Sequence, residues 1–214
     1  MNPLDTMIIL SVLIPTIPER HEKFTKLFNE LHRQLEYMQT FHSSLGHIEI
    51  LVDATPKFLD GGLSIGKKRE ALVNRAEGKY LCFLDDDDEI AGNYLETLVR
   101  LCQHGNDVVT FRSFCNLDSY WSVIDMSLKY SMNDQCNPEY ITRRRPWHVC
   151  PVKSFLAKVH DFDDISYGED WQWFEKVANK CLSESHTDAV IHMYIHRKSI
   201  SEADKIIQNG ILAK

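Results

Sequence analysis

Residues 80–89 read YLCFLDDDDE, five apolar residues that lead directly into four aspartates and a glutamate. The apolar part predicts a short strand. Three other segments of the first half have the same character, at residues 8–14 (IILSVLI), 48–52 (IEILV) and 107–111 (DVVTF). Because all four are almost continuously apolar rather than alternating, they predict strands covered on both faces, as in a parallel sheet with helices on each side.

The segments between these strands have the spacing of helices. Apolar residues recur at intervals of three and four over residues 24–38, and residues 18–20 (PER) lie where such a helix would start. Similar patterns over residues 67–76 and 93–102 are each followed by a glycine that would end the helix. Strands and helices therefore alternate, which is the pattern of a doubly wound α/β sheet.

The second half of the chain is less regular. Residues 112–150 hold aromatic and basic residues but no long periodic run, so no secondary structure is predicted there. Helical spacing returns over residues 169–180, and a last helix is predicted where Ser199 and Glu202 fit a capping box. We find no internal repeat and no low-complexity linker, and a single domain is expected.

Composition limits the class of function. The 214 residues carry 24 Lys and Arg against 31 Asp and Glu, a net charge of −7, which argues against nucleic acid as a partner because like charges repel. The six cysteines are scattered without a CxxC pair, which is typical of reduced thiols inside a cell. No apolar run approaches the roughly 18 residues of a membrane span, and no signal-peptide pattern is present. We therefore expect a cytoplasmic protein without a transmembrane segment.

Polar residues follow three of the predicted strands. Thr16 and Arg20 come after the first strand, Asp53 after the second, and residues 85–88 after the third. In a doubly wound sheet, ligands bind beyond the carboxyl ends of the strands, so these residues are the candidates for a site. Four consecutive aspartates repel one another unless a cation lies between them. Mg²⁺ or Mn²⁺, bound by one or two carboxylates and by phosphates of a substrate, is the usual solution.

The acidic run has two other interpretations. The aspartates could form a solvated turn in which Asp88 or Glu89 favours the start of the next helix. A calcium-binding loop of the EF-hand type over residues 85–96 is excluded on two counts. Ile90 stands where that loop needs glycine, and the segment before the loop reads as a strand rather than a helix.

Four segments of the sequence resemble segments of a known protein family. LSVLIPTIPER, EILVDAT, GKKREALVNRAEGKYLCFLDDDDEIAGNYLETLV and YGEDWQWFEKV are similar to the successive blocks of GT-A glycosyltransferases, in particular the family-2 group of inverting enzymes that use nucleotide-diphospho-sugars. The likeness covers most of residues 8–201 and is weakest over 112–145. The chain also resembles amino-terminal glycosyltransferase domains of chlorovirus proteins that glycosylate capsid protein.

The resemblance implies a fold and a separate function for each half of the chain. It implies an α/β, Rossmann-like GT-A domain in which a mostly parallel sheet is flanked by helices. Residues 1–111 would form the half that binds the nucleotide-sugar and the metal. Residues 112–214 would form the half that binds the acceptor and supplies the catalytic base.

The same resemblance assigns the acidic run to the DxD motif of the family. Asp85, Asp86 and Asp87 would be that motif, with Asp87 as the direct ligand of Mn²⁺ or Mg²⁺. Asp85 would orient the ribose or the sugar beside the metal. His196, in the loosely matching YIHRKSIS, would complete the metal shell or reach the diphosphate, with His192 as its rival.

The nucleotide would be held by the first and second strand ends. By resemblance, Asp53 meets the uracil ring, and Thr16 and Arg20 border the nucleotide. Arg69 matches the arginine of the ARN-like segment of the family, with Lys67 and Lys68 nearby. The family usually has Asn after this arginine, whereas this chain has Glu70. A basic cluster here would hold a diphosphate although the whole protein is acidic.

The sequence GED at residues 168–170 is the second chemical feature. By resemblance, Asp170 is the base that takes the proton of the acceptor hydroxyl, and Glu169 is a carboxylate that positions the acceptor or supports the base. Glu169 and Asp170 could instead serve only to stabilise a helix, because acidic residues favour the positive N-terminus of a helix.

Aromatic residues near both motifs are weaker candidates. Trp147 and His148 follow three arginines, and such a group could contact a sugar and a phosphate or serve packing alone. Trp171 could line the acceptor site, whereas Trp173 fits the core face of its helix.

The resemblance therefore implies a metal-dependent, inverting transfer of a sugar from a UDP-sugar to a hydroxyl of a glycan or glycoprotein acceptor. One rival is a nucleotidyltransferase, which normally needs a glycine-rich loop after the first strand, where this chain has PTIPER. Another rival is a non-catalytic module that binds a nucleotide-sugar or a glycan. The sequence names neither the sugar, nor the acceptor, nor the oligomeric state.

Overall fold

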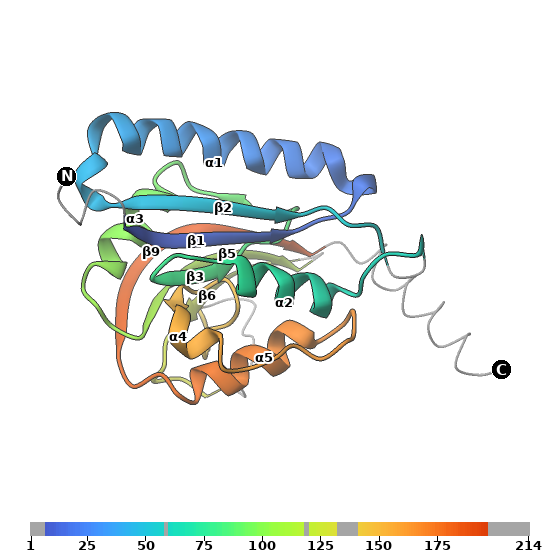
Figure 1. Ribbon diagram of the computed structural model, residues 1–214. Helices are drawn as coiled ribbons and strands as arrows, with labels where there is room; N and C mark the ends of the chain where they lie inside the picture. Colours follow the sequence, from blue (N-terminus) through green and yellow to red (C-terminus); the bar gives the residue numbers. More distant parts are fainter. Residues whose placement is uncertain (1–6, 58–59, 118–119, 132–140, 197–214) are drawn as a thin grey trace.

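Helices cover both faces of one mixed sheet (Figure 1). The computed structural model describes residues 7–57, 60–117, 120–131 and 141–196. Within these ranges the sheet has nine strands, and seven follow the order β2-β1-β3-β8-β5-β6-β7. The strand β9 pairs with β5 and also with β4.

Five of the strands run in one direction and four run against them. The first group contains β1 (Ile8–Pro15), β2 (His47–Asp53), β3 (Tyr80–Phe83), β5 (Val108–Leu117) and β9 (Glu184–His196). The second contains β4 (Glu89–Ile90), β6 (Tyr120–Met126), β7 (Thr142–Arg144) and β8 (Val152–Lys153). Most paired residues lie in parallel ladders, so the prediction of a mostly parallel α/β domain flanked by helices is confirmed.

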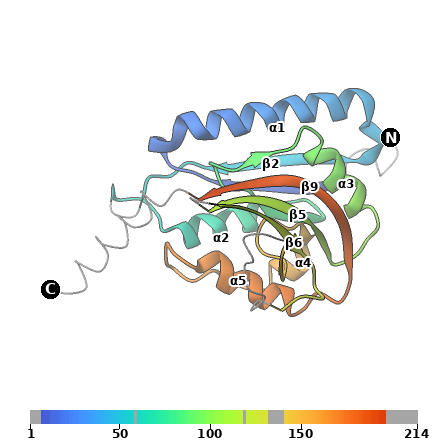
Figure 2. The ribbon, with the colours of Figure 1, turned by 180° about the vertical axis from the view of Figure 1, so that it is seen from behind.

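The helices lie in two layers. On one side of the sheet are α1 (His21–Phe41) and α3 (Tyr94–Cys102), which pack on each other. On the other side are α2 (Ile65–Arg75), α4 (Ser154–Ala157) and α5 (Glu169–Ala178) (Figure 2). Short 3₁₀ turns at Pro18–Arg20 and Ser43–Leu45 flank α1. None of the described helices is both long and apolar enough to span a bilayer.

The apolar strands were placed correctly from the sequence because burial on both faces suppresses alternation. Every residue of β1 after Ile8 is buried, and β3 is buried throughout. The predicted helices over 24–38, 67–76, 93–102 and 169–180 correspond to α1, α2, α3 and α5. The helix predicted near Ser199 lies outside the described residues. Glu89 lies in β4, so the idea that it starts the next helix is wrong.

The segment before α5 is hydrogen-bonded to the start of α2. The Ser64 hydroxyl donates to Asp164 Oδ1 at 2.5 Å, and the Gly66 amide donates to the carbonyl of Ile165 at 3.0 Å. A Cβ atom at Gly66 would lie 2.0 Å from the carbonyl oxygen of Asp163, so only glycine allows this approach. The contact fixes where α5 begins relative to α2, and residues of both helices meet at the strand ends.

Candidate active site

The four aspartates after β3 differ in exposure. The Asp88 amide donates to the carbonyl of Asp85 at 3.0 Å, which turns the chain back toward β4. The side chains of Asp86 and Asp88 are each 2% exposed, whereas those of Asp85 and Asp87 are 29% and 30% exposed. Two carboxylates therefore point into the protein, and two reach its surface.

Asp86 fastens the loop that follows β1. Its Oδ2 accepts a hydrogen bond from the Thr16 hydroxyl at 2.7 Å, and its Oδ1 accepts one from Arg20 Nη1 at 2.7 Å. Burial raises the pKa of Asp86, although the Arg20 charge and both hydrogen bonds oppose that shift. The structure thus brings the predicted residues Thr16, Arg20 and Asp86 together.

Asp88 is held by the amide of Asp85 and by a histidine. Its Oδ2 accepts from the Asp85 amide at 3.0 Å and lies 3.0 Å from His192 Nε2. The other ring nitrogen of His192 lies 2.7 Å from the Ser113 hydroxyl on β5. His192 is fully buried between these two partners, so it joins β9 to the acidic turn instead of reaching the exposed side.

Arg69 links three segments of the chain at the exposed aspartate Asp85. Its Nη2 donates to Asp85 Oδ1 at 2.8 Å, its Nε donates to Glu169 Oε1 at 3.1 Å, and its guanidinium lies over the ring of Phe83. The Arg69 side chain is 4% exposed, and its Nη1 has no hydrogen-bond partner among the described residues. A buried cation with a spare donor at a strand end is suited to bind an anionic oxygen of a ligand.

His148 connects the acidic turn to the predicted base. Its Nδ1 lies 2.8 Å from Asp170 Oδ2, and its Nε2 lies 3.5 Å from Asp85 Oδ2. Burial and the Arg69 charge lower the pKa of His148, but Asp170 and Asp85 outweigh them and raise it to about 9. Burial likewise opposes the ionised form of Asp170, yet the charges of His148 and Arg69 hold the pKa of Asp170 well below its usual range. At neutral pH a protonated His148 therefore lies between two carboxylates.

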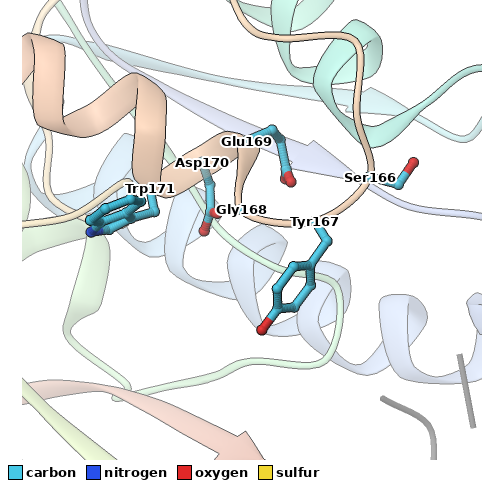
Figure 3. Close-up of a pocket in the computed structure, with 6 residues that line it drawn as sticks. All are labelled: Ser166, Tyr167, Gly168, Glu169, Asp170 and Trp171. Carbon is cyan, nitrogen blue, oxygen red and sulfur yellow. The ribbon is translucent and has the colours of Figure 1, made fainter. Parts of the chain in front are cut away.

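The start of α5 forms a pocket that contains the GED sequence. Gly168 has φ +79°, a left-handed conformation that lets the chain enter the helix, and Glu169 and Asp170 form its first turn. Burial raises the pKa of Glu169, although Arg69 opposes it. Figure 3 shows the residues that line the pocket, with Asp170 between two aromatic side chains. The lining residues are Ser166, Tyr167, Gly168, Glu169, Asp170 and Trp171.

Asp87 and Asp85 offer the atoms that a hard cation needs. Asp87 lies 3.2 Å from Lys23 Nζ and 3.7 Å from Arg20 Nη1, and it is partly exposed like Asp85. Carboxylate oxygens that reach solvent are the ligands that Mg²⁺ and Mn²⁺ prefer, and these metals usually keep waters or phosphates as further ligands. The residues present therefore fit the predicted metal, with Arg20 and Lys23 beside it for phosphate groups.

Of two adjacent lysines on α2, the second enters the site. Lys67 pairs with Glu70 at 2.7 Å on the surface of α2. The buried Lys68, which the sequence offered only as a neighbour of Arg69, donates from Nζ to the carbonyl of Thr16 at 2.8 Å and to that of Thr55. Asp53 also lies at this edge, where its carbonyl accepts from the Thr16 amide at 2.8 Å.

Three remaining candidates have different environments. His196 is the last residue of β9 and pairs in register with Leu117, but its side chain lies outside the described part of the structure. The ring of Trp147 is covered by the Arg144 guanidinium, which lies 3.7 Å from the ring centroid. Trp173 is buried and donates to the carbonyl of His160 at 3.0 Å, as its core position predicted.

Part of the chain is similar to a known protein family. Residues 55–159 match the family model described as glycosyl transferase family 2. The match includes α2 with Arg69, the acidic turn and His148, but it ends before the GED sequence. No curated protein sequence matches the chain.

Solved structures of TarS from S. aureus have a similar fold. TarS 1–349 in complex with UDP-GlcNAc superposes with a TM-score of 0.59 at 16% identity, covering 90% of this chain and 60% of that one. The complex of TarS 1–349 with UDP gives 0.59 at 17% identity, covering 88% and 61%. At such identities the likeness shows the fold, which is GT-A as the sequence predicted. This chain spans about three fifths of the length of these TarS structures.

Proposed function

We propose that this chain is a metal-dependent, inverting glycosyltransferase that moves a sugar from a UDP-sugar to a hydroxyl of a glycan acceptor. One observation carries the proposal. Asp170 lies 2.8 Å from His148, which lies 3.5 Å from Asp85, so the predicted base and the predicted metal-binding turn share one network. A direct displacement needs a base on one side of the reacting carbon and stabilisation of the leaving group on the other.

The donor would bind at the ends of β1, β2 and β3. Asp87 and Asp85 would hold Mn²⁺ or Mg²⁺, which neutralises charge on the diphosphate leaving group. Arg20, Lys23 and the spare Nη1 of Arg69 supply cationic donors around it. The family match and the TarS complexes with UDP and UDP-GlcNAc support a UDP-sugar as donor.

Asp170 would perform the proton transfer. As the acceptor oxygen attacks the anomeric carbon, Asp170 takes the hydroxyl proton, the bond from that carbon to the diphosphate breaks, and UDP leaves. His148 and Arg69 hold the pKa of Asp170 well below its usual range, so its carboxylate is ionised at neutral pH. The same charges make it a weak base, so the proton would transfer only as the acceptor oxygen bonds to the anomeric carbon and the hydroxyl becomes acidic. Glu169 orients Arg69 by accepting from its Nε at 3.1 Å. Attack from the side opposite the leaving group inverts the configuration of the sugar.

The acceptor would lie in the pocket at the start of α5. Tyr167 is 70% exposed and Trp171 is 50% exposed, on either side of Asp170 (Figure 3). Large aromatic rings that stay open to solvent provide flat apolar faces on which a sugar ring can stack. This arrangement would direct an acceptor hydroxyl toward the Asp170 carboxylate. A glycan on a capsid protein, acted on in the host cytoplasm, is the acceptor that the chlorovirus resemblance adds to the proposal.

A panel of UDP-sugars tests the proposal. We expect one member to release UDP in the presence of Mn²⁺ and a glycan acceptor, and we expect chelation to stop the release. Binding of UDP-sugars without any release, with every metal and acceptor tried, would assign the chain to the non-catalytic binding modules. Release of diphosphate from a nucleoside triphosphate and a sugar phosphate would indicate a nucleotidyltransferase instead.

A further inference from the structure

A second group of metal-binding side chains lies in the sheet, apart from the acidic turn. It consists of Asp125 on β6 and His186 and Asp188 on β9. One ligand atom from each of these residues lies within 4.8 Å of the other two. His186 precedes His192, the partner of Asp88, by six positions on the same strand, so this group belongs to an earlier part of β9.

The hydrogen bonds of His186 determine which ring nitrogen faces the carboxylates. Its Nδ1 lies 3.0 Å from the Thr110 hydroxyl, which itself donates to Glu184 Oε2 at 3.0 Å. A hydroxyl has one hydrogen to donate, so His186 Nδ1 carries the hydrogen of this contact. Nε2 then faces Asp125 at 3.5 Å and donates a hydrogen bond to Asp188 Oδ1 at 3.4 Å, and a metal ion bound by these residues would replace the hydrogen on Nε2. Histidines that bind metals are held in this way through their other nitrogen.

Asp125 has an oxygen that lacks a hydrogen bond although it is buried. Asp125 is 4% exposed, and its Oδ2 accepts from the Tyr130 hydroxyl at 2.8 Å. Within the part of the chain that the structure describes, Asp125 Oδ1 has no hydrogen-bond partner, and this atom is the one that faces His186. An unsatisfied buried carboxylate oxygen is costly, which indicates a ligand for this atom.

Arg112 on β5 is the competitor for such a ligand. Its Nη2 lies 2.6 Å from Asp188 Oδ1, and its Nε lies 3.6 Å from Asp125 Oδ1 without a hydrogen bond. The Asp188 side chain is 72% exposed, so a cation could enter from solvent as the Arg112–Asp188 pair opens. An exposed ion pair of this kind contributes little to stability and is easily exchanged.

We propose that Asp125, His186 and Asp188 bind a divalent transition-metal ion of the zinc type. One nitrogen and two carboxylate ligands suit Zn²⁺ better than Mg²⁺, which prefers oxygen ligands alone. Three protein ligands leave a coordination position for water on the exposed side. The ion would connect β6 to β9 across β5, and it would replace Arg112 as the partner of Asp188. This site is independent of the proposed sugar transfer.

Zinc binding to the full chain tests the proposal. The titration uses an Asp87→Ala background so that the acidic turn does not contribute, with calorimetry and thermal unfolding as readouts. We expect one Zn²⁺ per chain and a rise in Tm of about 5–10 °C when free zinc exceeds its Kd a hundredfold. Asp188→Asn, which changes an exposed side chain, and His186→Gln should each weaken zinc binding at least tenfold, and Tyr130→Phe should weaken it by about tenfold.

Two further variants distinguish this site from adventitious binding. Arg112→Gln removes the competing charge, so it should tighten zinc binding. His42→Gln is the matched control, because His42 also lies near a carboxylate, Glu96 at 3.7 Å, but outside this group. The proposal is wrong if zinc does not bind, if Asp188→Asn and His186→Gln leave binding unchanged, or if Arg112→Gln weakens it.

Discussion

Alternate aspartates of the acidic turn have opposite environments. Asp85 and Asp87 are about 30% exposed and contact cations that also line the candidate site. Asp86 and Asp88 are 2% exposed and hold the loop after β1 and the strand β9 in place. Four identical residues in a row therefore divide into a pair that is available to a metal and a pair that supports the turn. The chemistry of such a run depends on which side of the chain each carboxylate occupies.

The largest effect is expected at Asp170, the proposed base, which His148 connects to the exposed Asp85. Asp170→Asn keeps the shape of the side chain but removes its ability to accept a proton, so the transfer rate should fall by about 10²–10⁴-fold. Binding of UDP and Mn²⁺, measured by calorimetry, should stay close to that of the unchanged protein. Asp161→Asn, an exposed acid in the connection before α5, is the control and should keep its rate. Equal losses of transfer and UDP binding would remove Asp170 from the role of base.

The buried pair should act on stability. Asp88→Ala removes the carboxylate that accepts from the Asp85 amide and lies 3.0 Å from His192 Nε2, and the loss of a buried hydrogen-bond partner costs about 1–3 kcal/mol. The free energy of unfolding should therefore fall by about 1–3 kcal/mol, measured by urea denaturation. A decrease below about 0.5 kcal/mol would contradict a supporting role for Asp88.

The exposed pair should act on ligand binding with little effect on stability. Asp87→Ala removes a carboxylate whose contacts to Lys23 and Arg20 are partly exposed and contribute little to folding. We expect the free energy of unfolding to change by less than about 1 kcal/mol, and Mn²⁺-dependent binding of UDP to weaken at least tenfold. The comparison with Asp88→Ala is the decisive one, because the two carboxylates are adjacent in sequence. If both variants lose stability alike, the alternation has no functional meaning.

A smaller effect is expected at the aromatic residues of the pocket. Tyr167→Ala should raise the KM for the acceptor by about threefold to tenfold, since a ring stacking contact contributes about 0.5–1.5 kcal/mol. The KM for the donor should not change, because Tyr167 lies in the connection before α5 and lines the pocket proposed for the acceptor. Steady-state kinetics with the acceptor varied checks this expectation, and Phe155→Ala, another exposed aromatic residue on α4, is the control. A change in the KM for the donor alone would mean that Tyr167 contacts the donor and not the acceptor.

Local patterns predicted the first half of the fold well. The runs at 8–14 and 80–84 are buried on both faces, so their composition alone identified β1 and β3. The second half was harder, because β6 and β7 run against the main direction of the sheet and mix buried with exposed residues. Residues 112–150 therefore have no single period, although β6 pairs with β5 locally, from Leu117 and Tyr120 outward.

The meeting of some candidate residues was predictable for the same reason. Thr16, Arg20 and Asp86 lie together because residues at neighbouring strand ends meet at one edge of a parallel sheet. The role of His148 was missed, although the residue was noted. Its partners Asp85 and Asp170 lie far from it in sequence, and no local spacing reports their contact.

The sequence by itself determined the strand ends, the acidic run and the GED start of a helix, because burial and capping leave local patterns. The tertiary structure decided how these residues are used. It turned Asp85 outward and Asp88 inward, buried Lys68 while Lys67 pairs with Glu70 at the surface, and placed His148 between two carboxylates. Charge, burial and distance across the fold set these roles, and none of them can be read from neighbours along the chain.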